Sequence, residues 1–216
     1  MEGEETAYRL VRYILLCEQK KKVIKKEDLT SKIEGRGNNK KYMDAAGKIL
    51  EDVFRFRLVE IADGSKEGKK RYVLQNILER TLRNRTLQHI TDETHWTALT
   101  VVCLIVLGGG KVEEEKLVRL VKKTVGADSA GETIKWLRKA KYIEAVVRTE
   151  RDFGERETHY VLGGRSLVEF TEENILDYVK EICLDEKDED CVLKIENSVL
   201  VGASLSGIRK KKESKT

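Results

Sequence analysis

The sequence predicts a mainly α fold with small β wings, an α+β protein in which one order of elements occurs twice. Three observations support this prediction. Segments with the hydrophobic spacing of helices alternate with short hairpin patterns. A hydrophobic share of 40% is enough for a packed core, and 216 residues fit one large domain or two small ones. The chain contains no proline, so its turns must come from Gly, Asn, Asp and Ser.

The first expected helix spans residues 8–17 and carries more apolar surface than one core contact requires. At about 100° per residue, six side chains form one core-facing stripe. They are Tyr8, Leu10, Val11, Ile14, Leu15 and Cys17. Tyr13 and Leu16 fall outside the stripe, with Leu16 nearly opposite to it. A partner or the chain itself must cover this surplus, because full exposure of one leucine forgoes about 1.5–3 kcal/mol of burial.

Five further elements complete the first half of the chain. They are a very short strand at 23–24, helices over 26–33 and 42–54, and strands over 57–62 and 71–75. The segment between the last two strands, DGSKEGKK, is rich in turn-forming residues. Helix, short strand, two helices and a two-stranded wing is the element order of a winged helix, a relative of the helix-turn-helix.

The same order returns in the second half. The apolar run 96–107 fits a buried strand or a buried helix by periodicity alone, and its place in the order favours a helix that ends at the glycines 108–110. Ser129 and Glu132 have capping-box spacing and predict the start of a third helix. The remaining elements are a helix over 113–123, wing strands over 142–148 and 158–164, and a helix after Thr171.

The sequence therefore predicts tandem winged-helix modules. We expect a first module over residues 4–78, a connector over 79–95, a second module over 96–184, and an acidic then basic tail over 185–216 that is disordered. The acidic N-terminus has no signal-peptide pattern, and the longest apolar run is too short for a bilayer. We therefore expect an intracellular protein without a membrane segment.

No residue pattern indicates an enzyme, a metal site or a cofactor. The four cysteines form no CxxC pair, and the three histidines complete no zinc spacing. The stretch LGGGK lacks the spacing of a phosphate-binding loop. No Ser/His/Asp or Cys/His set is suggested either, so we expect a protein without a catalytic site.

Blocks of the sequence, taken in order, resemble the MAGE homology domain family, whose fold is a pair of winged helices. They read LVRYILLCEQKKKVIKKEDL, AAGKILEDVFRFRLVEI, YVLQNIL, ALTVVCLIVLGGGKVEEEKL, WLRKAKYIEAVVR and HYVLGGRSLVEF, within about residues 8–184. The chain departs from the family pattern at Val23, where proline is common, and at Arg55, where glycine follows phenylalanine. A third departure is Leu162, Gly163, Gly164 and Arg165 in place of Trp-Gly-Pro-Arg.

The small single-domain form is most similar to the family's ancestral branch, the third non-SMC element subunit of the SMC five/six complex. That resemblance implies a nuclear, non-catalytic scaffold in an SMC complex for chromosome maintenance and DNA repair. It also implies a RING-type ubiquitin ligase partner, a kleisin partner and contact with double-stranded DNA through the second winged helix. The basic stretch RKKK at 209–212 is either a nuclear signal or a nonspecific arm.

The resemblance assigns a partner surface to the first helix. Family members bind their RING partner through a dileucine there, and Ile14, Leu15 and Leu16 match that position without a gap. We expect the RING-partner surface to comprise Tyr13, Ile14, Leu15 and Leu16, chiefly Tyr13 and Leu16. The alternative is that the connector or the second module covers the surplus.

Cations predict where DNA would bind. Lys135, Arg138 and Lys139 share one face of the third helix of the second module, the helix that a DNA-binding winged helix places in or along the major groove. Wing arginines would add phosphate contacts. The expected DNA-binding residues are Lys135, Arg138, Lys139, Arg148, Arg151 and Arg156. The face has no Asn or Gln, so sequence-specific reading is not expected. The alternative is an ordinary solvated charged face.

The kleisin is expected in a groove of the second module, lined in part by Leu117, Leu120 and the helix after Thr171. Two other function classes stay open at this point. One is a substrate adaptor or enhancer of a RING ubiquitin ligase that does not bind DNA. The other is a stand-alone winged-helix DNA-binding regulator.

Overall fold

The structure is a computed structural model that describes residues 2–33, 39–61, 70–78, 93–126, 129–149, 156–183 and 197–202. It divides into two compact units, Met1–Ile90 and Thr91–Thr216. The boundary lies inside the stretch 79–95 that we expected to be a connector, of which 79–92 lies outside the described residues. Within the described ranges, no helix combines the length and the apolar character that crossing a bilayer requires.

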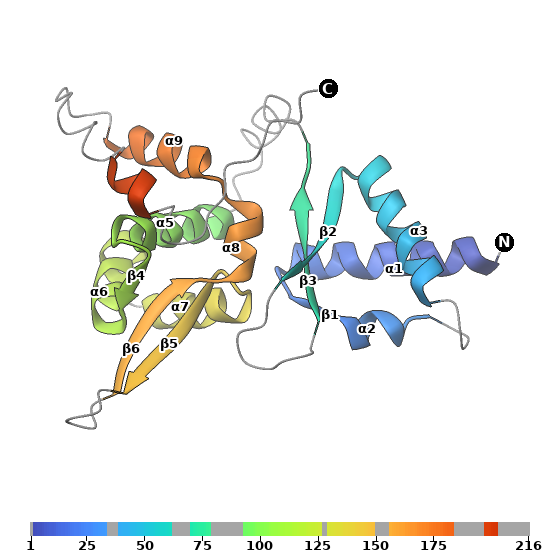
Figure 1. The fold of residues 1–216 in the computed structure, drawn as a ribbon, viewed down its shortest axis with the longest axis horizontal. Helices are drawn as coiled ribbons and strands as arrows, with labels where there is room; N and C mark the ends of the chain where they lie inside the picture. Colours follow the sequence, from blue (N-terminus) through green and yellow to red (C-terminus); the bar gives the residue numbers. More distant parts are fainter. Residues whose placement is uncertain are drawn as a thin grey trace. The chain divides into compact units, whose positions relative to one another are not determined.

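The first unit has the expected order of elements (Figure 1). They are α1 (Glu2–Gln19), β1 (Ile24–Lys25), α2 (Lys26–Thr30), α3 (Asn39–Asp52), β2 (Phe56–Ile61) and β3 (Arg71–Asn76). The strands form an antiparallel sheet in the order β1-β3-β2. Its core is made of aliphatic side chains from every layer, and Leu10, Ile14, Leu29, Leu50 and Leu74 are all 1% exposed or less. Packing of α1 and α3 against each other and against the sheet builds this core.

The second unit repeats the order and adds to it. It contains α5 (Glu93–Leu107), β4 (Lys111–Glu113), α6 (Glu114–Val125), α7 (Ala130–Lys139), β5 (Ile143–Thr149), β6 (Arg156–Leu162), α8 (Gly164–Glu169) and α9 (Glu172–Cys183). The antiparallel sheet has the order β4-β6-β5. The fold class predicted from the sequence, tandem winged-helix modules with small β wings, is confirmed.

The apolar run at 96–107 is a helix, as its place in the order predicted. It lies in α5, where seven of the fifteen residues are buried because other elements of the unit surround the helix. The helix ends where the glycines begin: the Gly110 amide donates to the Ile105 carbonyl at 2.9 Å. Gly109 and Gly110 have φ of +79° and +87°, the left-handed region that glycine occupies without strain.

Three local features differ from the sequence-based expectations. The strand β4 and the helix α8 were not predicted, since each is short and depends on tertiary partners. Ser129 does occupy the N-cap position of α7, but its side chain makes no capping hydrogen bond. Glu132, the other residue of the expected capping box, instead lies 3.2 Å from the Lys135 ammonium. The start of α7 was therefore predicted correctly and its cap was not.

A short helical segment at 197–202 lies within the stretch that we expected to be a disordered tail. Val199 in this segment is fully buried in the hydrophobic core of the second unit. That expectation therefore fails for these six residues, because an aliphatic side chain finds a place in the core. The rest of 185–216, except these residues, lies outside the described ranges.

Candidate functional site

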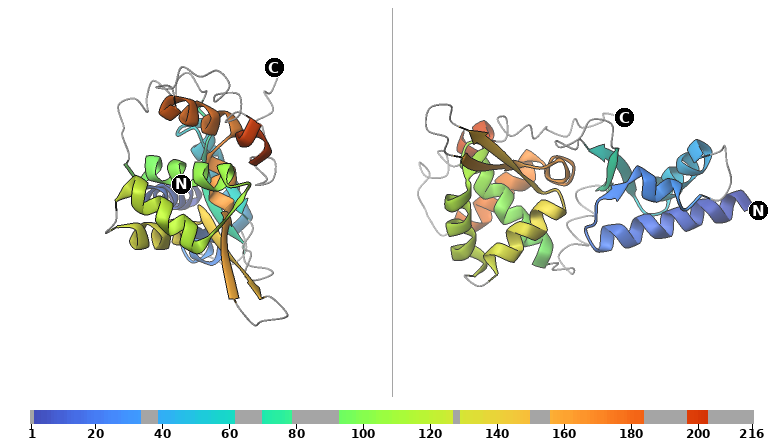
Figure 2. Two further views of the ribbon diagram at one scale, coloured as in Figure 1. Left: turned by 90° about the vertical axis from the view of Figure 1, so that its left-hand side faces the viewer. Right: turned by 90° about the horizontal axis from the view of Figure 1, so that it is seen from below.

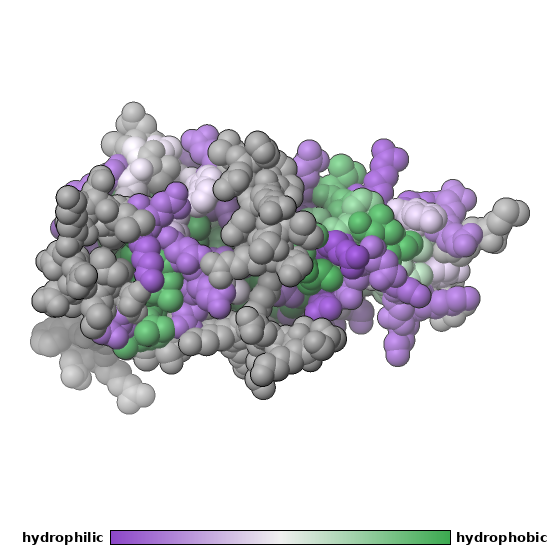
Figure 3. All heavy atoms as spheres, turned by 90° about the horizontal axis from the view of Figure 1, so that it is seen from above, coloured by the Kyte–Doolittle hydropathy of each residue, from purple (hydrophilic) through white to green (hydrophobic). Residues whose placement is uncertain are grey.

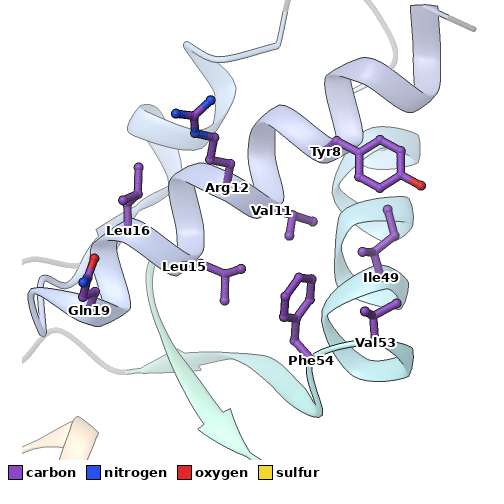
Figure 4. A pocket seen from close by; sticks show the side chains of 9 residues that line it. All are labelled: Tyr8, Val11, Arg12, Leu15, Leu16, Gln19, Ile49, Val53 and Phe54. Carbon is purple, nitrogen blue, oxygen red and sulfur yellow. The ribbon is translucent and has the colours of Figure 1, made fainter.

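An apolar groove lies between α1 and α3 of the first unit. It encloses about 720 Å³ and is lined by Tyr8, Val11, Arg12, Leu15, Leu16, Gln19, Ile49, Val53 and Phe54. Figure 4 shows Val11, Leu15 and Phe54 pointing into the space between the two helices, while Arg12 and Leu16 point away from α3 on the other side of α1. Seen from above, hydrophobic side chains also gather on the surface of this unit (Figure 3).

Four large apolar side chains of the groove are exposed to solvent. Tyr8 is 61% exposed, Leu16 48%, Val53 68% and Phe54 43%. Single exposed apolar residues are normal on protein surfaces, but these four line one concavity. A contiguous apolar surface of this kind is characteristic of sites that bind another protein. The groove is therefore the candidate partner-docking site of the first unit.

The backbone after α3 places Phe54 beside α1. The helix closes with hydrogen bonds from the Val53 and Phe54 amides to Ile49 and Leu50, and Arg55 then takes a φ of +57°. This left-handed residue turns the chain into β2, and its carbonyl accepts a 2.9 Å hydrogen bond from the Ile77 amide. Glycine is favoured in this conformation, and the family pattern has glycine where this chain has Arg55.

The four residues expected on the partner surface have different environments. Ile14 is fully buried and belongs to the core, so its side chain is not accessible to a partner. Tyr13 is half-buried, and the Lys32 ammonium lies 5.6 Å from the centre of its ring. Burial, with contributions from Cys17 and Asp28, raises the pKa of Tyr13. Leu15 and Leu16 line the groove, so only these two of the four lie where a docking partner would meet them.

Tyr8, Val53 and Phe54 were missed by the sequence analysis. The helical wheel placed Tyr8 on the core-facing stripe, yet its side chain is exposed at the groove. An available signal was the pair Val53-Phe54 directly after a helix, two large apolar residues at a turn. A wheel assigns directions around one helix and does not show how far the neighbouring helix extends to cover them.

The second unit presents the basic helix face predicted for α7. Lys135, Arg138 and Lys139 are all exposed. The Arg138 guanidinium lies 5.9 Å from the centre of the Tyr160 ring on β6, a cation–π contact that holds it against the sheet. The Tyr160 hydroxyl donates to the Glu114 carboxylate at 2.9 Å. Burial, together with this hydrogen bond, raises the pKa of Tyr160. The Tyr160 ring thus holds the Arg138 side chain against the sheet, while Arg138 remains exposed to solvent.

The wing arginines are only partly described. Arg148 lies on β5 and Arg156 on β6, near the tip of the same hairpin, where Arg148 pairs with Glu157 and Thr149 with Arg156. Arg151 lies outside the described residues.

The helix α6 carries cations that the sequence analysis did not select. Lys116, Arg119 and Lys123 are exposed and spaced at i, i+3 and i+7, which places them along one face of the helix. That spacing was the signal that could have found them.

Leu117 of the expected kleisin groove is fully buried in the core and so lines no surface, whereas Leu120 is half-buried and accessible in part.

The described residues contain no group of three or more His, Cys, Asp or Glu side chains arranged to hold a metal ion. Cys103 lies in the core, and burial raises the pKa of its thiol to about 12. A thiol with that pKa stays protonated at neutral pH and is a poor nucleophile.

Comparisons with known proteins agree with this structure. The family model of the MAGE homology domain matches residues 10–173. A search of curated protein sequences found no match. Among solved structures, the fold is similar to a chain of the "Nse1-Nse3-Nse4 complex" with a TM-score of 0.70 and 20% sequence identity. The similarity covers 92% of this chain and 98% of that one. The family match spans most of both winged-helix units, and the chain therefore belongs to the MAGE homology domain family.

Proposed function

We propose that this protein is a non-catalytic scaffold subunit of a nuclear SMC-type complex for chromosome maintenance and DNA repair. It would bind a RING-type ubiquitin ligase through the first unit, and a kleisin and double-stranded DNA through the second. Family membership and the structural similarity to a chain of the Nse1-Nse3-Nse4 complex support this proposal. The observation that carries it is the exposed apolar groove between α1 and α3.

The chemistry of the groove favours a folded protein partner. Burial of a leucine or phenylalanine side chain contributes about 1.5–3 kcal/mol, so four exposed apolar side chains can supply much of a specific affinity. Arg12 lies at the rim and would meet a carboxylate or a carbonyl of the partner. A RING ligase bound here would be held and oriented by the scaffold, which would stimulate ubiquitin transfer without contributing catalytic groups.

The second unit supplies the charge for binding duplex DNA. The exposed cations of α7 and the basic face of α6 lie on the two helices that correspond to the helix-turn-helix of a DNA-binding module. Contacts of lysine and arginine with phosphates need no base-specific geometry, so binding that depends on salt and not on sequence is expected. For the kleisin, Leu120 together with the exposed side of α9 is the remaining candidate surface.

Reconstitution tests the proposal directly. The purified chain is mixed with the RING ligase and kleisin subunits of the same organism and analysed by size-exclusion chromatography with light scattering. We expect one complex with a single copy of each subunit. A stable homodimer that protects one defined DNA sequence would instead indicate a stand-alone regulator. A complex with the ligase and no affinity for duplex DNA would indicate a substrate adaptor.

A further inference from the structure

The helical segment at 197–202 is seated on the second unit, beside α5 (Figures 1 and 2). Val199 is fully buried and belongs to the same core as α5, Ile175 and Val179. Its neighbours Leu200 and Val201 are 41% and 58% exposed. One aliphatic side chain of the segment therefore enters the unit, while the following two remain at the surface.

Gly202 makes a second contact that depends on its lack of a side chain. A Cβ at this position would lie 1.9 Å from the Val106 carbonyl oxygen and 2.7 Å from its carbon, distances that no real side chain adopts. The obstacle is the backbone of α5, which cannot move aside as a flexible side chain can. Val199 and Gly202 are three residues apart, so they lie on one face of the helical turn. The surface of α5 around Val106, called the seat below, thus accepts an aliphatic residue followed three positions later by glycine.

The docked segment is held by the seat rather than by its own stability. The six described helical residues would not form a helix by themselves in water, because nucleation costs more than so few hydrogen bonds return. One fully buried side chain offsets only part of the conformational entropy that six residues lose on ordering. The segment is therefore ordered only through its contacts with α5, and a change that removes those contacts should release it.

We propose that the surface of α5 at Val106 is a peptide-docking site, and that residues 197–202 are its tethered and exchangeable occupant. The tether is short: thirteen residues, 184–196, separate this segment from α9. A link of that length gives the tail an effective concentration of about millimolar at the seat. A free peptide therefore competes poorly until the tail is weakened. The inference goes beyond the proposed function and does not depend on it, and the family match ends at residue 173, before this segment.

The test uses the full-length chain and a labelled peptide with the sequence of residues 193–206. In Val199→Asp the tail loses its buried anchor, whereas Val201→Asp places the same charge at an exposed position two residues away. We expect the peptide to bind Val199→Asp at least tenfold more tightly than it binds the wild type or Val201→Asp, as measured by fluorescence anisotropy. Equal binding to all three chains, or no binding to a folded Val199→Asp chain, overturns the proposal.

A second pair of variants covers the case in which Val199→Asp does not fold. Gly202→Ala introduces the Cβ that would strike the Val106 carbonyl, whereas Gly131→Ala adds a Cβ with nothing within 4 Å. Hydrogen exchange should show lost protection at 197–202 in Gly202→Ala and unchanged protection there in Gly131→Ala. In addition, a labelled peptide of residues 193–206 that carries alanine at position 202 should bind the Gly202→Ala chain at least tenfold more weakly than the peptide that carries glycine there. Full protection of 197–202 in Gly202→Ala would overturn the proposal.

Discussion

The guanidinium of Arg165, fully buried at the start of α8, lies 2.7 Å from the carboxylate of Glu169, whose side chain is 9% exposed at the end of the same helix. The Arg165 Nε also donates to the Ala140 carbonyl at 2.9 Å, and the Tyr142 hydroxyl donates to the second Glu169 oxygen at 2.7 Å. This network ties the end of α7 to α8. It places one residue of the Leu-Gly-Gly-Arg stretch, which departs from the family pattern, in a defined structural role.

We expect Arg165→Met to destabilise the second unit by about 3–5 kcal/mol, because the nearly buried Glu169 carboxylate loses its charged partner and keeps only the Tyr142 hydroxyl. The exposed pair Lys135–Glu132 provides the control, since Lys135→Ala should cost less than about 1 kcal/mol. Both tryptophans, Trp96 and Trp136, lie in this unit, so tryptophan fluorescence in denaturant reports its unfolding alone. An equal, small effect of both substitutions would show that the network contributes little.

Gly163 fits tightly against the end of α7. A Cβ there would lie 2.3 Å from the Lys141 carbonyl oxygen, so Gly163→Ala should destabilise the unit by about 1–3 kcal/mol through forced backbone movement. Gly131→Ala, in the open first turn of α7, should instead stabilise it by about 0.4–1 kcal/mol. Thermal unfolding of both variants checks the opposite signs, and a stable Gly163→Ala chain would contradict the close approach.

The groove between α1 and α3 should lose its partner when its apolar surface receives a charge. Leu16→Asp and Phe54→Asp should each weaken binding of the RING subunit at least tenfold, because an aspartate would be buried there without a partner. Leu16 and Phe54 are already exposed in the free chain, so its stability should change little. Leu167→Asp, at a 40% exposed residue of the second unit, is the matched control for isothermal titration calorimetry. Unchanged affinity of a folded Leu16→Asp chain would remove Leu16 from the docking surface.

The α7 cations should determine how the affinity for duplex DNA depends on salt. Each phosphate contact contributes about 0.9 to the slope of log affinity against log salt concentration. Lys135→Ala with Arg138→Ala should therefore reduce the magnitude of that slope by about 1.8, equally for unrelated sequences. Lys40→Ala with Lys41→Ala removes two exposed cations from α3 of the first unit and should leave the slope unchanged. Identical slopes for both double variants, measured by anisotropy, would argue against α7.

Arg55 has the left-handed backbone that glycine adopts without strain. The conformation costs an L-residue about 1–2 kcal/mol, and glycine loses about 0.5–1 kcal/mol more chain entropy on folding. Arg55→Gly should therefore stabilise the first unit by about 0.5–1 kcal/mol. Chemical unfolding followed by circular dichroism measures this, and Arg55→Ala, which keeps the strain, should show no such gain.

Much of the fold was predictable because its determinants are local. The helices of both units follow from residues three and four positions apart, and the glycines at 108–110 mark the end of α5. The wing hairpins follow from alternating apolar residues on either side of turn-forming segments. The elements that escaped prediction, β4 and α8, are too short for a periodicity and form through pairing with β6 and through the Arg165 network.

The sequence alone determined the two winged-helix modules, the surplus apolar residues of α1 and the cations of α7, because periodicity and charge are properties of neighbouring residues. The tertiary structure decided which of the two surplus apolar residues of α1 is accessible to a partner. Lys32 lies over Tyr13, whereas Leu16 stays 48% exposed and joins Val53 and Phe54 in one groove. It also decided that Val199, far along the chain, completes the second core. Exposure depends on which distant segments pack nearby, and a helical wheel contains no information about them.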